Sequence, residues 1–110
     1  MSAATQPPAA APDAKLEALF QSLARQWKEE CGPSSSTTDL AMCPSYQRII
    51  GLGPVVVPLL LRELEHAPDH WFWALKAITG ADPVPVESRG RVHEMAGLWI
   101  EWGRQQGYQW

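Results

Sequence analysis

The sequence predicts an all-α domain, a compact bundle of four or five short helices. Three observations support this fold class. Apolar residues recur at spacings of three and four in several segments, which is the periodicity of an amphipathic helix. Prolines and glycines separate those segments, as expected for short helices joined by turns. The chain has 110 residues, 45% of them hydrophobic, which suffices for one small core and not for two.

Residues 69–79 are predicted to form the central helix. Asp69 can cap its first turn, and Gly80 can supply the left-handed residue that ends it. Four apolar residues lie along one face at i, i+3, i+4 and i+7: Trp71, Ala74, Leu75 and Ile78. Because most of the remaining surface of this segment is apolar as well, we expect other helices to cover it on most sides.

Three longer segments are predicted to pack around this helix. Residues 13–30 and 88–105 each place apolar side chains along one helix face, and Gly97 in the second segment indicates the close approach of a neighbouring helix. Residues 54–65 also show helical spacing. A buried strand over residues 55–61 is the alternative, since β-branched residues favour sheets, but the prolines of this region count against it.

Shorter elements complete the predicted chain. Thr38 or Asp39 can cap a turn that runs through Met42, and a short helix is predicted over residues 44–50, ended by the glycines that follow it. Residues 1–12 are mostly small residues, prolines and polar residues, which bury too little apolar surface to offset the entropy of ordering. We therefore expect a disordered tail over residues 1–12 and a single helical domain over residues 13–110.

The composition argues against several function classes. The net charge is −3 and the nine Lys and Arg residues are spread thinly, so no nucleic-acid partner is expected. The longest apolar run, residues 49–61, is shorter than the roughly 20 residues of a membrane helix, and the N-terminus lacks the pattern of a secretory signal. Cys31 and Cys43 are too few for a disulfide scaffold and lack the spacing of a zinc site. A reducing, cytoplasmic location is expected.

Two resemblances extend this interpretation. Residues 52–80 resemble one HEAT-type repeat, through Leu52-Gly53-Pro54, Val57-Pro58-Leu59-Leu60, Ala74-Leu75, Ile78 and Gly80. Residues 46–102 are similar to a family of small bacterial proteins of unassigned function, through Tyr46-Gln47-Arg48-Ile49-Ile50-Gly51-Leu52-Gly53, His70-Trp71-Phe72-Trp73-Ala74-Leu75, Ile78-Thr79-Gly80, Pro83-Val84 and Trp99-Ile100-Glu101-Trp102-Gly103. The first resemblance implies a packed helix pair and a surface that binds macromolecules, and the second implies a bacterial setting.

Candidate chemistry is sparse. Glu65, His66, Asp69 and His70 form the densest group of potential metal ligands and proton-transfer residues. Pro68 interrupts this region, so the two histidines do not lie one turn apart on a continuous helix. We therefore expect no catalytic residue, metal or other cofactor. A small enzyme that uses a metal in the His66–His70 region, or a cysteine thiolate, remains the alternative.

Six tryptophans are unusually many for 110 residues. Most should belong to the core, but so small a core has little room for all six. Half-exposed aromatic rings beside cationic side chains commonly anchor protein interfaces. The candidate partner-binding residues are Tyr46, Arg48, Trp73, Lys76, Trp102 and Trp110.

These observations favour a small non-enzymatic module that binds a protein partner. Its size and type suggest an antitoxin-like or accessory subunit of a bacterial toxin or defence system. Association with a second copy of the chain is left open, and no membrane partner is expected. A further alternative is a DNA-binding regulator in which residues 54–79 form a helix-turn-helix, although the acidic net charge argues against it.

Overall fold

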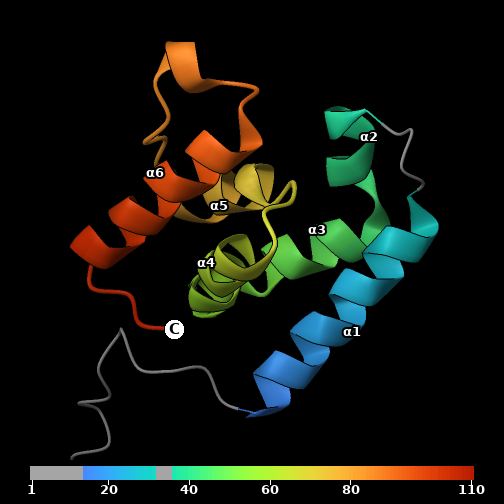
Figure 1. The fold of residues 1–110 in the computed structure, drawn as a ribbon. Coiled ribbons are helices and arrows are strands. Elements are labelled where there is room, and N and C mark those ends of the chain that lie inside the picture. Colours follow the sequence, from blue (N-terminus) through green and yellow to red (C-terminus); the bar gives the residue numbers. More distant parts are fainter. Residues whose placement is uncertain (1–13, 32–35) are drawn as a thin grey trace, which may run out of the picture.

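The computed structural model describes residues 14–31 and 36–110 (Figure 1). Within these residues the chain forms six α-helices and no strand, which confirms the all-α prediction. The helices are α1 (Ala14–Glu30), α2 (Thr37–Met42), α3 (Pro44–Gly51), α4 (Val57–His66), α5 (Phe72–Thr79) and α6 (Val92–Gln105). Two short 3₁₀ helices, η2 (Gly53–Val56) and η3 (Val86–Ser88), lie between them. The tail predicted for residues 1–12 lies outside the described residues.

The core is organised around Trp71, which immediately precedes α5 and is 1% exposed. Its ring lies 4.5 Å from that of Trp27 and 5.6 Å from that of Phe20, both on α1, and stacks on Tyr46 of α3 at 5.7 Å. Aromatic pairs at these separations stabilise a core beyond the area that they bury. The predicted apolar face of residues 69–79 is therefore the place where α1, α3 and α5 meet.

Four of the helices pack as two main pairs. α1 packs mostly against α3, and α4 packs mostly against α6, while α5 contacts α3 more than α4. Figure 1 shows α1 and α2 at one side of the molecule and α6 at the other. The two helices of the proposed HEAT-like pair, α4 and α5, thus share fewer contacts with each other than with α6 and α3, respectively. Membership of that repeat class stays a prediction.

Residues 55–61 are helical, so the alternative of a buried strand is wrong. Pro54 lies in the first turn of η2 and Pro58 in the first turn of α4, where a missing backbone N–H costs nothing. The side chains of residues 56–61 are buried. No helix in the described part of the chain is both long and apolar enough to span a bilayer.

The close approach between helices occurs at Gly103 and not at Gly97. Gly97 is exposed, and a Cβ built on it would meet nothing within 4 Å. A Cβ on Gly103 would lie 2.5 Å from Cδ1 of Leu61, on α4, and 3.3 Å from the ring of Trp110. α6 therefore fits against α4 because Gly103 has no side chain.

Two helix starts differ from the predictions. α5 begins at Phe72, because the Asp69 carboxylate accepts a hydrogen bond from its neighbour His70 N–H at 2.7 Å and does not cap the helix. α6 begins at Val92, four residues later than predicted, because Gly90 turns the backbone with φ +87° two residues before it.

The α1–α2 connection corrects two further predictions. Ser36 caps α2, accepting the Asp39 N–H at 3.1 Å, so neither Thr38 nor Asp39 is the cap. Cys31 at the end of α1 and Cys43 at the start of α3 form a disulfide, with their Cα atoms 6.7 Å apart. The sequence did not predict this bond, because a pair 12 residues apart gives no local sign that the chain folds back on itself.

Candidate functional site

The described surface contains a groove of about 670 Å³ between α5 and the start of α6. Volumes of 300–1,000 Å³ are typical of binding sites. The lining residues are His70, Phe72, Trp73, Lys76, Ala77, Gly90, Val92 and Met95. Most of them are apolar, so the groove offers hydrophobic contact with a small number of polar groups at its edge.

The groove exists because one side of α5 is left uncovered. Trp73, Lys76 and Ala77 lie at i, i+3 and i+4 on this helix, and all three are exposed. Trp73 is 40% exposed, which makes it an exposed indole next to an apolar hollow. The expectation that α5 is covered on most sides therefore holds for the Trp71 side and fails for the Trp73 side.

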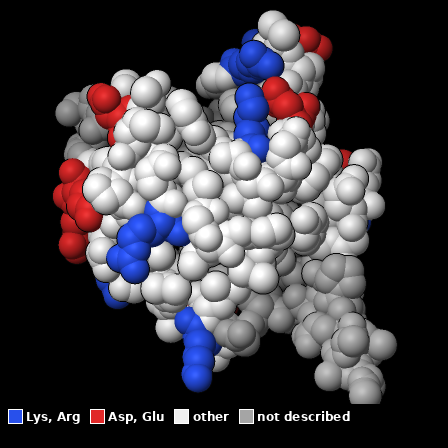
Figure 2. All heavy atoms as spheres, turned by 180° about the vertical axis from the view of Figure 1, so that it is seen from behind, with Lys and Arg blue, Asp and Glu red and all other residues white. Residues whose placement is uncertain are grey.

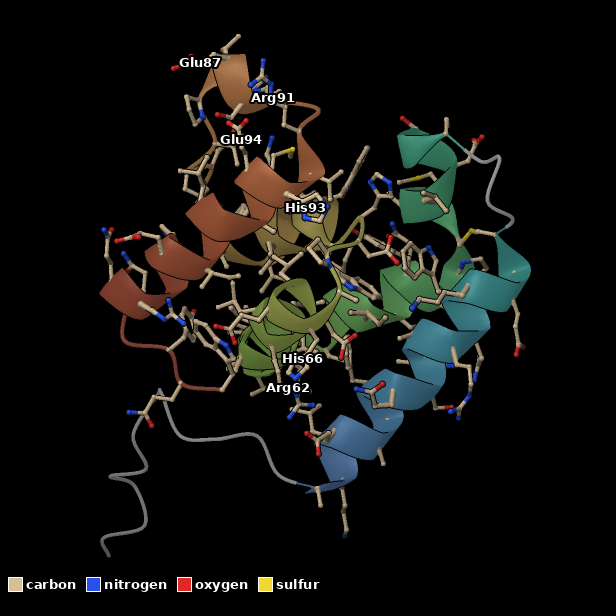
Figure 3. All side chains as sticks on the ribbon, viewed as in Figure 1. Arg62, His66, Glu87, Arg91, His93 and Glu94 are labelled. Carbon is tan, nitrogen blue, oxygen red and sulfur yellow. A yellow bond between two sulfur atoms is a disulfide. The ribbon has the colours of Figure 1, made fainter. Side chains whose placement is uncertain are left out.

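The opposite wall comes from the start of α6, which side-chain bonds hold in place. Arg91 donates to Glu94 at 3.1 Å, and the Ser88 hydroxyl donates to the same carboxylate at 3.2 Å. The hydrogen bond from Arg91 lowers the pKa of Glu94 below its ordinary value, and the hydrogen bond from Ser88 lowers it further to a smaller extent. Figure 3 shows Glu87, Arg91 and Glu94 gathered around the projecting η3 segment and the first turn of α6.

Tyr46 supports the groove from beneath. Its hydroxyl donates to the His70 carbonyl oxygen at 2.9 Å and accepts the Ala74 N–H at 2.9 Å. Ala74 lies in the first turn of α5, where backbone N–H groups have no partner within the helix. Tyr46 thus provides the cap that was predicted for Asp69. Burial raises the pKa of Tyr46 well above its ordinary value.

Lys76 is the lining residue that carries a permanent charge. Its Nζ lies 3.4 Å from Oδ2 of Asp82, and Arg89 lies 3.2 Å from the same oxygen. The other Asp82 oxygen accepts the Val84 N–H at 3.4 Å. Asp82 is therefore shared among three donors, and Lys76, whose side chain is 53% exposed, is one of them.

Of the six predicted partner-binding residues, the structure brings only Trp73 and Lys76 together in the groove. Arg48 is exposed on α3 but does not line the groove. Tyr46 is fully buried, so it cannot touch a partner while the fold is intact, and its role is to cap α5. The other two candidates, Trp102 and Trp110, pack within the chain.

Trp102 and Trp110 both belong to the C-terminal packing. Trp102 lies edge-on to Trp99, with ring centroids 5.2 Å apart, and also contacts Tyr108. The Trp110 indole N–H donates to Glu65 at 2.7 Å, and Arg104 lies over the same ring. Both rings are partly buried by neighbours of this same chain, which explains two of the six tryptophans without a partner.

The histidines do not converge. The ring of His66 bonds through Nδ1 to the Arg62 carbonyl oxygen at 2.9 Å, whereas His70 lines the groove. Figure 3 shows His66 and His93 well apart, on α4 and at the start of α6. Among the residues that the structure describes, no three His, Cys, Asp or Glu side chains are placed to hold a metal ion. Neither cysteine in that part of the chain is a free thiol.

Charge is sparse on the face seen from behind (Figure 2). Most residues on that face are neither basic nor acidic, and its basic side chains form no broad patch: those at the top of the view lie beside acidic ones, and the others are scattered. A surface that tracks phosphates gathers its cations in a patch or stripe, and this face does not show one.

Several lining residues were not predicted, namely His70 as a groove residue, Gly90, Val92 and Met95. Val92 and Met95 belong to the apolar face of the predicted last helix, and the sequence does not show whether such a face packs in the core or lines a groove. The motif Arg89-Gly90-Arg91 before an apolar helix was the one available signal of a sharp turn there.

Comparison with protein-family models, curated proteins and solved structures finds no significant match to this chain.

Proposed function

We propose that the chain is a small non-enzymatic module that binds a partner protein in the groove between α5 and α6. The observation that carries the proposal is the exposed Trp73 indole at the edge of a groove of about 670 Å³. Tryptophan is enriched among the residues that dominate binding energy, because it buries a large rigid surface at small entropic cost. The groove rests on the capped first turn of α5, so its shape is set before binding.

The lining chemistry supports binding over catalysis. Six of the eight lining residues offer no group that transfers protons or attacks a substrate, and the remaining two are His70 and Lys76. A catalytic site needs an acid, base or nucleophile held in position by a second polar group. The disulfide also removes both thiols that the alternative of a cysteine enzyme required.

The cellular setting is part of the same proposal. The resemblance to small bacterial proteins and the small size of the chain support an antitoxin-like or accessory subunit of a bacterial toxin or defence system. A cytoplasmic location is proposed as well. Because the two cysteines are bonded in the structure, their number no longer supports a reducing location, so the oxidation state of the Cys31–Cys43 pair in the native cell becomes the deciding measurement.

The proposal is tested by recovering the tagged protein from its native cell and comparing wild type with Trp73→Ala and Leu19→Ala. Leu19 is a matched control, because it is 39% exposed, against 40% for Trp73, and lies on α1 outside the groove. We expect one protein to be recovered in near-equal amount with wild type and Leu19→Ala. With Trp73→Ala, shown to be folded by circular dichroism, the affinity should fall by about 2 kcal/mol or more.

A partner that binds Trp73→Ala as tightly as wild type contradicts the proposal, because the groove would then play no part in binding. Loss of the partner from both variants would also count against it, since the effect would not be specific to the groove.

A further inference from the structure

We infer that the groove recognises a helical segment that carries a bulky apolar residue and, one turn away, a carboxylate that pairs with Lys76. This inference rests on the proposed function and names the chemistry of the partner. Trp73 and Lys76 are three residues apart on α5, so the apolar and cationic parts of the groove are separated by about 4.5 Å along the helix axis. A segment that lies along α5 meets both parts if its own two residues are one turn apart.

The charge of the groove determines whether an acidic or a basic partner residue is favoured. The lining contains one permanent cation, Lys76, and no Asp or Glu among the described residues. The chain as a whole carries a net charge of −3, so this cationic position is a local exception to an acidic protein. An acidic side chain placed there gains an ion pair, whereas a basic one meets repulsion from Lys76.

Lys76 can change partners without leaving a charge unpaired. Its present partner, Asp82, also bonds to Arg89 at 3.2 Å and to the Val84 N–H at 3.4 Å. When Lys76 turns to a carboxylate in the groove, these two donors remain with Asp82. The ion pair between Lys76 and Asp82 is the longest in the described part of the chain, at 3.4 Å, and both side chains are about one third or more exposed. Such surface pairs are weak and easily exchanged.

The apolar part of the groove accepts the partner's bulky residue. Phe72 is buried, while Val92 and Met95 of α6 are partly buried and line the same hollow as the exposed Trp73. A methionine side chain is flexible enough to pack against aliphatic side chains and aromatic rings alike. We therefore expect the groove to accept any large apolar side chain. Its selectivity should come from the carboxylate of the partner.

The test is a selection from a displayed library of random 12-residue peptides, run in parallel on wild type, Trp73→Ala, Lys76→Gln and the control Leu19→Ala. Enriched peptides are then synthesised and their affinities measured by calorimetry at low and high salt. We expect the peptides enriched on wild type to carry Asp or Glu three or four residues from a bulky apolar residue. The substitution Lys76→Gln should lower the affinity for these peptides roughly 3- to 10-fold and remove most of the salt dependence of binding.

A second variant tests the exchange of partners. Asp82→Asn removes the carboxylate that competes for Lys76, so acidic peptides should bind it more tightly than they bind wild type. Unchanged or weaker binding to a folded Asp82→Asn variant contradicts the exchange.

The two proposals fail in different ways. Peptides that require Trp73 but show no acidic preference, or that bind Lys76→Gln as tightly as wild type, overturn the inference about the carboxylate and leave the groove as the binding site. Peptides that bind Trp73→Ala as tightly as wild type, or a selection that enriches none, overturn the groove itself.

Discussion

Tyr46 links two parts of the chain through one hydroxyl group. It donates to the carbonyl of His70, at the edge of the groove, and accepts the N–H of Ala74, in the first turn of α5. The ring is fully buried and stacked on Trp71, so solvent cannot replace either bond. One residue of α3 thereby fixes both the start of α5 and the backbone of a groove residue.

Tyr46→Phe keeps the ring and removes both bonds. We expect the free energy of unfolding to fall by about 1–3 kcal/mol, because a buried N–H and a buried C=O lose their partner. Urea unfolding followed by circular dichroism measures the change. Tyr108→Phe is the control, since its ring is only partly buried, and it should change stability by less than about 0.5 kcal/mol. Equal effects of the two substitutions would contradict the role given to Tyr46.

The same residue makes stability depend on alkaline pH. Burial raises the pKa of Tyr46 above the value of 10.0 that it has in an unfolded chain. Above that pH the unfolded chain releases the proton while the folded chain keeps it, so the free energy of unfolding falls as the pH rises. Between pH 9 and about 11.5, wild type should lose more stability than Tyr46→Phe. Parallel pH profiles would show that Tyr46 does not contribute.

At the scale of elements, α6 is fitted to α4 at Gly103. Gly103 lets α4 approach, with Leu61 and Trp110 packed where a side chain would stand. The predicted contact at Gly97 was wrong, because an exposed glycine and a buried glycine on one helix look the same in a sequence. Only the position of α4 decides between them.

Gly103→Ala and Gly97→Ala form a matched pair on one helix. The new Cβ at position 103 would lie 2.5 Å from Leu61, so the buried side chain must shift, and we expect a loss of about 1–3 kcal/mol. At position 97 nothing lies within 4 Å, so alanine should raise stability by about 0.5–1 kcal/mol through its higher helix propensity. Thermal unfolding of both variants measures the difference, and a Gly103→Ala variant as stable as wild type would disprove the close packing.

The elements also show how much the sequence could predict. Apolar spacing located α1, α4, α5 and α6, and proline and glycine marked most of their ends. The predicted start of α5 was wrong because the helix is capped by the Tyr46 hydroxyl, which lies 28 residues before Ala74, the residue whose N–H it accepts. The start of α6 was misplaced because η3 and the turn at Gly90 are set by contacts of a connecting segment and not by periodicity.

The site was predicted only in part, for the same reason. Trp73 and Lys76 are neighbours on one helix, so spacing alone could pair them. Val92 and Met95 come from a helix about 20 residues away, and no local pattern shows that it meets α5 at a groove. Trp102 and Trp110 were proposed as interface residues because the sequence does not show which side chains surround them. In the folded chain, Trp99 packs on Trp102 and Glu65 bonds to Trp110.

At the scale of the whole molecule, the Cys31–Cys43 disulfide joins the C-terminal end of α1 to the residue that directly precedes α3. It closes a loop that contains α2, and α2 is otherwise fastened by the Trp27 indole N–H, which donates to the Leu40 carbonyl at 2.9 Å. A bond that closes a loop of this length reduces the entropy of the unfolded chain.

Reduction, or the double substitution Cys31→Ser with Cys43→Ser, should lower the free energy of unfolding by about 2–4 kcal/mol. Denaturant unfolding with and without a reducing agent measures this, and the double variant, which has no bond to lose, is the control and should not respond. Alkylation of intact native cells, followed by mass spectrometry, then shows whether the pair is bonded there. A fully reduced pair would favour the proposed cytoplasmic location, and a bonded pair would contradict it.

The distribution of the six indoles gives the molecule an optical property. Trp73 is the one exposed indole among them, since the other five are buried or partly buried by their neighbours. Its emission should therefore lie at the longest wavelengths of the spectrum and be the part that iodide quenches. Anything that fills the groove moves this indole into an apolar environment, so its emission shifts to shorter wavelength and escapes the quencher. The chain thus carries its own label for occupancy at the very residue on which binding is proposed to depend.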